Sequence, residues 1–152
     1  MLPSPLQLDG YYLKEARFES ISPLENLPEK SVDSGRVNLD ITHKAEQDAR
    51  DPYKWRCEVT VRTKQPSRSK PPYSFVVTYV GFFEVDPRYP LEKVALLAKT
   101  NGPAVLYSAA RETIITLASR SPYPISILPL VTFLPLDKKG IAKRPTRKAL
   151  GA

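Results

Sequence analysis

The chain has 152 residues, of which 41% are apolar and 26% charged, with a formal net charge of +7. This is the size and composition of one ordinary globular domain. Its single cysteine, Cys57, excludes an intrachain disulfide framework and favours a reducing compartment. The sequence starts without the basic and apolar regions of a signal peptide, and its longest apolar run, residues 125–136, is too short to cross a bilayer. We therefore expect a cytoplasmic protein without membrane insertion.

Most of the positive charge lies at the C-terminal end. From Asp137 onward the net charge is +5, and the basic residues are Lys138, Lys139, Lys143, Arg144, Arg147 and Lys148. This tail is either a solvated, disordered end or a cluster that contacts nucleic-acid phosphates or an acidic protein. No aromatic residue lies between the cations, which argues against stacking on bases and against nucleic acid as a partner. We divide the chain into a domain over residues 1–136 and a disordered basic tail over residues 137–152.

Alternating apolar and polar residues predict four strands in the first part of the chain. The first covers Tyr11–Ser20, where Lys14 is out of phase with the apolar residues Tyr12, Ala16 and Phe18. The second covers residues 36–43, which alternate strictly and put His43 on the apolar side near the strand end. A polar loop, residues 22–28, separates the two strands and carries two leucines, Leu24 and Leu27.

The third predicted strand follows a turn at residues 48–52 and places Cys57 on its apolar face, beside Trp55 and Val59. A polar, proline-rich loop over residues 64–72 leads to the fourth strand, residues 73–85, in which Gly81 indicates a bulge or a close backbone approach. Four strands joined by turns, with no helical pattern between them, predict an antiparallel sheet.

The periodicity then becomes helical. Apolar residues predict a short helix over residues 91–98, a break at Asn101-Gly102-Pro103, and a longer helix over residues 103–119 that starts at the proline. Strands followed by helices give an α+β fold.

Residues with catalytic or ligand-binding chemistry are scarce in this chain. His43 is the only histidine, and Cys57 has the setting of an inert buried thiol without a second cysteine for a metal site. No glycine-rich phosphate loop, nucleophile elbow or paired-carboxylate motif occurs. We expect no enzymatic activity, cofactor or metal, and an enzyme that depends on His43 is the least favoured alternative.

Residues 123–134 are apolar, but their prolines oppose a helix or a central strand. An apolar segment of this kind either packs into the core or an oligomer interface, or lines a groove that binds another molecule. The two interpretations stay open at this level.

The predicted long helix contains residues that resemble a known family. Residues 102–114, with Pro103, Tyr107 and Arg111-Glu112 among them, resemble the signature helix of the SecB-type export chaperones. Residues 119–124 are similar to the family's Ser-Arg-Gly-Thr-Phe-Pro, and residues 131–133 fall where it has Val-Asn-Phe. The resemblance covers roughly residues 10–134.

This resemblance implies a four-stranded antiparallel sheet with one long and one short helix on one face, assembled as a dimer of dimers. It also implies a holdase, a chaperone that binds unfolded preproteins without ATP in long apolar grooves. The groove residues that it implies here are Leu24, Leu27, Leu39, Ile41, Tyr123, Ile125, Ile127, Leu128, Leu130 and Phe133.

The chain also departs from the family pattern. The second, C-terminal helix is absent, because Leu134-Pro135-Leu136 and the basic tail follow Phe133. Glu15 and Glu19 match two acidic positions at which the family docks on the SecA motor, but Val76 stands at a third, and the basic balance opposes such docking. The client is therefore either preproteins in general or one dedicated partner, such as an antitoxin.

Overall fold

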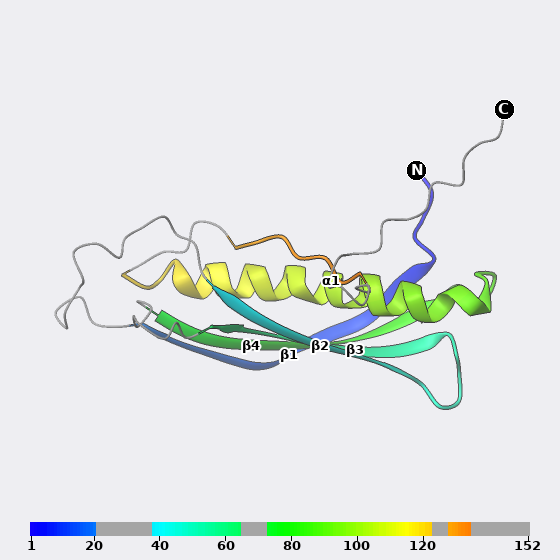
Figure 1. Cartoon of the computed structure of the whole chain (residues 1–152), viewed down its shortest axis with the longest axis horizontal. Helices are drawn as coiled ribbons and strands as arrows, with labels where there is room; N and C mark the ends of the chain where they lie inside the picture. The colour runs from blue at the N-terminus through cyan, green and yellow to red at the C-terminus, as the bar shows by residue number, and fades with distance from the viewer. Residues whose placement is uncertain (21–37, 65–72, 123–127, 135–152) are drawn as a thin grey trace, which may run out of the picture.

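The computed structural model describes residues 1–20, 38–64, 73–122 and 128–134, which form one antiparallel sheet with a long helix across one face (Figure 1). The elements in chain order are β1 (Leu6–Ser20), β2 (Leu39–Gln47), β3 (Lys54–Thr63), β4 (Tyr73–Val85) and α1 (Leu91–Ala118). The strand order is β1-β4-β3-β2, so β1 and β2 are the edges. The predicted α+β class and four-stranded antiparallel sheet are confirmed.

The core lies between α1 and the inner face of the sheet, the face that α1 covers. In β3 the alternation predicted from the sequence holds, because Cys57, Val59 and Val61 are fully buried while the residues between them are not. β4 is central and buries side chains on both faces: Val77 and Phe83 face α1, and Val80 is covered on the outer face.

The first strand begins at Leu6, earlier than predicted, and two bulges interrupt its pairing with β4. One bulge lies between Leu13 and Glu15, at the out-of-phase Lys14. A bulge adds one residue and therefore reverses which side chains face inward. As a result Ala16 and Phe18 face α1, whereas Tyr12 lies opposite Val80 on the outer face and stacks on Phe82.

The hairpin between β2 and β3 is held by aspartates. β2 continues to Gln47, past the predicted end at His43, and residues 36–37 lie outside the described residues. The Asp48 N–H donates to the Lys54 carbonyl at 2.8 Å, and the Asp51 carboxylate accepts the Tyr53 N–H at 2.9 Å. Aspartate favours turns because its side chain accepts hydrogen bonds from nearby backbone.

The helical region differs from the prediction, because α1 is a single helix and the short separate helix is not found among the described residues. The predicted break at Asn101-Gly102-Pro103 lies within it (Figure 1). Proline costs α1 one backbone hydrogen bond, to the carbonyl of Lys99. Burial offsets that cost, since Gly102 and Pro103 are both buried against the sheet.

Two glycines allow α1 to lie close to the sheet. A Cβ on Gly102 would lie 2.6 Å from the Cys57 sulfur, and a Cβ on Gly81 would lie 2.7 Å from the Leu106 side chain. The predicted close approach at Gly81 is thus confirmed, and the bulges are in β1 instead. Neither position has room for a larger residue unless its neighbour moves.

Candidate functional site

An open groove of about 570 Å³ lies beside α1 on the side of β2. Three elements form it: β2, the first half of α1, and the segment Leu128–Leu134, which runs alongside the helix without regular secondary structure (Figure 1). Its lining among the described residues is mostly apolar and comprises Ile41, His43, Leu96, Lys99, Thr100, Val131, Thr132, Phe133 and Leu134. Two of the apolar lining side chains, Leu96 and Leu134, are exposed, which is typical of a binding surface.

The segment Leu128–Leu134 is anchored to α1 by Tyr107. The Tyr107 hydroxyl donates to the Pro129 carbonyl at 2.5 Å, and Leu128 is fully buried. Burial raises the pKa of Tyr107, although the nearby charge of Arg111 opposes this rise, so the phenol stays protonated and able to donate. Phe133 then lies between the rings of Tyr107 and His43, at centroid distances of 6.2 and 4.9 Å. These contacts fix one wall of the groove.

The edge of β2 beside this groove is not paired with any strand among the described residues. Hydrogen bonds from Lys64 N–H to the Asn38 carbonyl and from Asp48 N–H to the Lys54 carbonyl, both 2.8 Å, fix the ladder with β3. Hydrogen-bonded pairs recur at every second residue of an antiparallel ladder, so even-numbered residues of β2 bond to β3. The odd-numbered ones, including Ile41 and His43, direct their N–H and C=O groups to the open edge. Their side chains face the groove.

The site has little with which to catalyse a reaction. Among the residues that the structure describes, no three His, Cys, Asp or Glu side chains gather where they could hold a metal ion. Burial raises the pKa of the Cys57 thiol to about 12, so it is neither a nucleophile nor a ligand at neutral pH. The His43 ring packs edge-on against the ring of Phe133. The arrangement suits binding of an extended apolar chain.

Comparisons with known proteins identify the family of the chain. The family model for the preprotein translocase subunit SecB matches residues 3–143. The chain belongs to the SecB family. Among solved structures, the Mycobacterium tuberculosis SecB-like chaperone Rv1957, in complex with a ChAD peptide from the HigA1 antitoxin Rv1956, is similar at a TM-score of 0.54 and 18% identity. That match covers 83% of this chain and 90% of the other.

A Streptococcus agalactiae protein of unknown function is also similar, at a TM-score of 0.43 and 11% identity over 82% of this chain and 96% of the other. No curated protein matches the chain. Within the described parts of this SecB-family chain, no helix combines the length and the apolarity that a membrane span requires.

The structure places the groove residues that the family resemblance implied in three different settings. Leu39 and Ile41 are half-buried on the groove side of β2, and Phe133 lines the groove. Leu128 is buried in the core, whereas Leu130 is 87% exposed. Five others lie outside the described residues: Leu24, Leu27, Tyr123, Ile125 and Ile127.

Sequence reasoning missed the part of the groove that α1 contributes, namely Leu96, Lys99 and Thr100. Leu96 and Thr100 are four residues apart, one helical turn, and this spacing was available in the sequence. The expected break at residues 101–103 concealed it, because a short separate helix has no fixed relation to the segment at Phe133.

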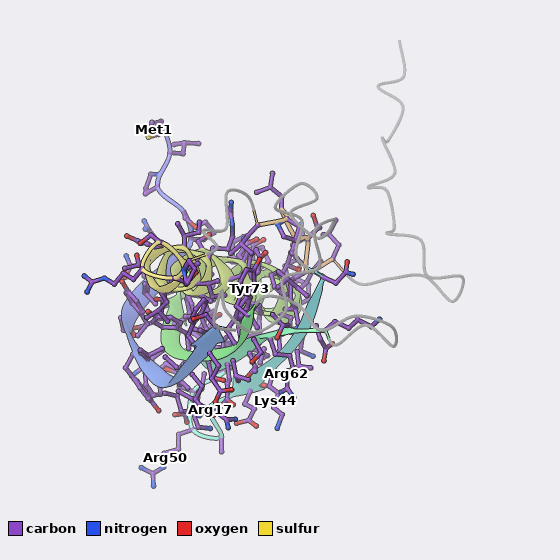
Figure 2. The ribbon with its side chains drawn as sticks, turned by 90° about the vertical axis from the view of Figure 1, so that its left-hand side faces the viewer. Met1, Arg17, Lys44, Arg50, Arg62 and Tyr73 are labelled. Carbon is purple, nitrogen blue, oxygen red and sulfur yellow. The ribbon has the colours of Figure 1, made fainter. Side chains whose placement is uncertain are left out.

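Glu15 and Glu19 lie on the outer face of the sheet, where positive and negative charges alternate. Glu15 pairs with Arg17 at 2.8 Å, and Glu19 shares a shallow depression with Arg17 and Arg62. Figure 2 shows Arg17, Lys44 and Arg62 on the side of the sheet away from α1. This SecB-family chain therefore has a mixed-charge outer face instead of an acidic one.

Further along the outer face, Glu58 accepts hydrogen bonds from Arg56 at 3.0 Å and from Lys14 at 3.4 Å. Burial alone would raise the pKa of Glu58, but these two cations outweigh it and hold the pKa below its ordinary value. The acids of this face thus have cations of the same chain as neighbours.

The opposite edge of the sheet carries an apolar strip. Leu8, Tyr11 and Leu13 of β1 lie on the inner face, opposite β4 residues that face α1, yet all three are exposed. Val105 and Ile115 of α1 are exposed as well. Among the described residues β1 is thus a long edge strand that pairs only with β4 and carries apolar side chains along its edge, a surface that proteins normally cover.

Proposed function

We propose that this SecB-family chain is a cytoplasmic, ATP-independent holdase that binds unfolded or partly folded polypeptides and performs no catalysis. The observation that carries the proposal is the apolar groove at the free edge of β2, where Ile41 and His43 contribute groove side chains and edge backbone groups together. A client strand can hydrogen-bond to that edge whatever its sequence. Its apolar side chains then gain roughly 25 cal/mol for each Å² that they bury.

Two leucines of α1 provide a matched test. Leu96 lines the groove and is 56% exposed, whereas Leu91 lies near the start of the helix, is 55% exposed and does not line it. Because both are exposed, Leu96→Gln and Leu91→Gln should fold equally well. We expect Leu96→Gln to weaken suppression of aggregation of a slowly folding client, measured by light scattering without ATP, while Leu91→Gln behaves like the natural protein.

If the natural protein fails to slow the aggregation of several such clients, the holdase proposal is wrong. If the two variants lose activity equally, the groove is not the client site. Circular dichroism melting of both variants controls for unfolding.

The relative solved with an antitoxin peptide favours a second candidate, a chaperone dedicated to one partner such as an antitoxin. Affinities measured for a panel of unfolded clients distinguish the two functions. A general chaperone binds them within about tenfold of one another, a spread of about 1.4 kcal/mol. A dedicated one binds a single client far more tightly than the rest.

We further propose that the protein is a homo-oligomer, a dimer of dimers, as the family resemblance implies. The exposed strip at Leu8, Tyr11 and Leu13 supports a contact between copies at β1. The native mass in solution tests this, and Leu13→Arg should lower it by placing a charge in the strip. A natural protein that runs as a monomer at every concentration overturns the proposal.

Docking on a translocase motor through Glu15 and Glu19 is not part of the proposal, since Arg17 pairs with Glu15 and lies beside Glu19. The boundary between a chaperone domain at residues 1–136 and a basic tail at residues 137–152 stays a prediction. The tail lies outside the described residues.

A further inference from the structure

The groove beside β2 contains a cation, Lys99, that has no ion-pair partner among the described residues. Lys99 lies in the lining and is exposed, and it belongs to none of the ion pairs formed within the described residues. No acidic side chain is among the described lining residues. The groove therefore offers positive charge in an apolar setting.

Two donors on the same side of α1 are also unsatisfied. The Thr100 hydroxyl, which lies in the lining, and the Arg111 Nε are both buried without a hydrogen-bond partner. Thr100, Tyr107 and Arg111 share one helical face, because seven and eleven residues are close to two and three full turns. Buried polar groups are normally paired, and a lone one costs free energy. The face of α1 that bears Tyr107 thus holds two buried polar groups, the Thr100 hydroxyl and the Arg111 Nε, without a partner among the described residues.

Within the described parts of the chain, the elements beside Lys99 bring no compensating acid to it. On β2, the side chains of Asp40 and Glu46 point to the outer face, opposite Arg62 and Arg56. On α1, Glu92 lies seven residues from Lys99, about 10 Å along the helix. The segment Leu128–Leu134 contains no charged residue at all.

We infer that the groove prefers client segments in which an aspartate or glutamate lies among apolar residues, with the carboxylate directed to the exposed ammonium of Lys99. This inference rests on the proposed holdase function and names the chemistry of its clients. A carboxylate accepts several hydrogen bonds at once, and its negative charge makes its hydrogen bond to an ammonium stronger than that of a neutral acceptor. The apolar residues on either side fill the groove around Leu96 and Phe133.

Labelled peptides with one extended apolar sequence test the inference, with a single Glu moved along the peptide and replaced by Gln or Lys in matched partners. At low salt, the best Glu peptide should bind the intact protein about threefold more tightly than its Gln partner, as for an exposed ion pair. High salt should remove the difference, because exposed charges are screened. Fluorescence anisotropy gives each Kd.

Lys99→Gln should abolish the preference, and Lys99→Glu should reverse it in favour of the Lys peptide. Lys93→Gln is the control, since this exposed lysine of α1 is not in the lining. If Glu and Gln peptides bind equally at every position, or if Lys99→Glu leaves the preference unchanged, the inference is wrong while the holdase proposal stands. If no peptide of the series binds, the holdase proposal fails as well.

Discussion

The two sides of α1 differ in how closely they pack on the sheet. On the side of β3 and β4 the helix packs closely on the sheet, with Gly102 against Cys57 and Leu106 against Gly81. A Cβ added at either glycine would collide with its neighbour. Toward β2 the same helix stands away from the sheet edge and leaves a groove of about 570 Å³ lined by Leu96 and Thr100. One side of the helix supplies stability and the other leaves apolar surface available for a partner.

The largest expected effect of this difference is on stability. Leu106 is fully buried, so Leu106→Ala should lower the free energy of unfolding by about 2–5 kcal/mol. Leu96→Ala removes the same atoms from an exposed position and should change it by no more than about 0.5 kcal/mol, while the proposed function expects it to weaken client binding. Urea unfolding measures both. Similar losses in the two variants would contradict the division of the helix into a closed and an open side.

The next effect concerns the contact between Gly102 and Cys57. Gly102→Ala gains helix propensity but places a carbon 2.6 Å from the Cys57 sulfur, and we expect a net loss of about 1–2 kcal/mol from overpacking. In a Cys57→Ala background the same change should become neutral or stabilising. A double-mutant cycle measures this coupling. Additive effects would show that the approach at residue 102 is not close.

On the open side, removing a polar group should stabilise the protein. Thr100→Val keeps the shape of the side chain and deletes a buried hydroxyl that has no hydrogen-bond partner. We expect the free energy of unfolding to rise by about 1 kcal/mol, because the desolvation cost of the unpaired hydroxyl disappears. Thermal melts of the client-free protein test this, and a loss of stability would mean that the hydroxyl is bonded in solution.

The smallest expected effect lies on the outer face of the sheet. Glu58→Gln should cost about 0.5 kcal/mol at neutral pH, since its partners Arg56 and Lys14 are partly solvated. The pKa of Glu58 is lowered in the folded state, so its contribution is present at neutral pH and is lost as pH falls through that lowered value. The difference between variant and natural protein should therefore shrink below the ordinary pKa of 4.5. A constant difference down to pH 2 would contradict the sign.

The sheet could be predicted from the sequence because each strand buries one face, which leaves a period of two in the residues. The exception was β1, where the extra residue near Lys14 moves Tyr12 to the outer face. The position of a bulge depends on the pairing with the neighbouring strand. The residue pattern of one strand shows only a break in its alternation.

The helix and the groove were harder to predict for tertiary reasons. Asn101-Gly102-Pro103 is a helix-breaking sequence in isolation, but burial of Gly102 and Pro103 against the sheet outweighs that tendency. The groove depends on the position of Phe133, which lies between the rings of Tyr107 and His43. The apolar residues 123–134 left a binding groove and a packed segment equally open, and the contribution of Lys99 and Thr100 required the continuous helix.

The ladder of β2 determines how a client would be recognised. The residues with free edge groups are the same odd-numbered residues whose side chains face the groove, so a paired client strand presents only every second side chain to it. The intervening side chains point to the outer face and solvent. Such a groove would contact every second side chain of a client strand and would not contact the side chains between them. Many client sequences could therefore bind. We expect that a shift of the client strand by one residue along β2 exchanges the side chains that face the groove with those that face solvent. One client could therefore bind in two registers.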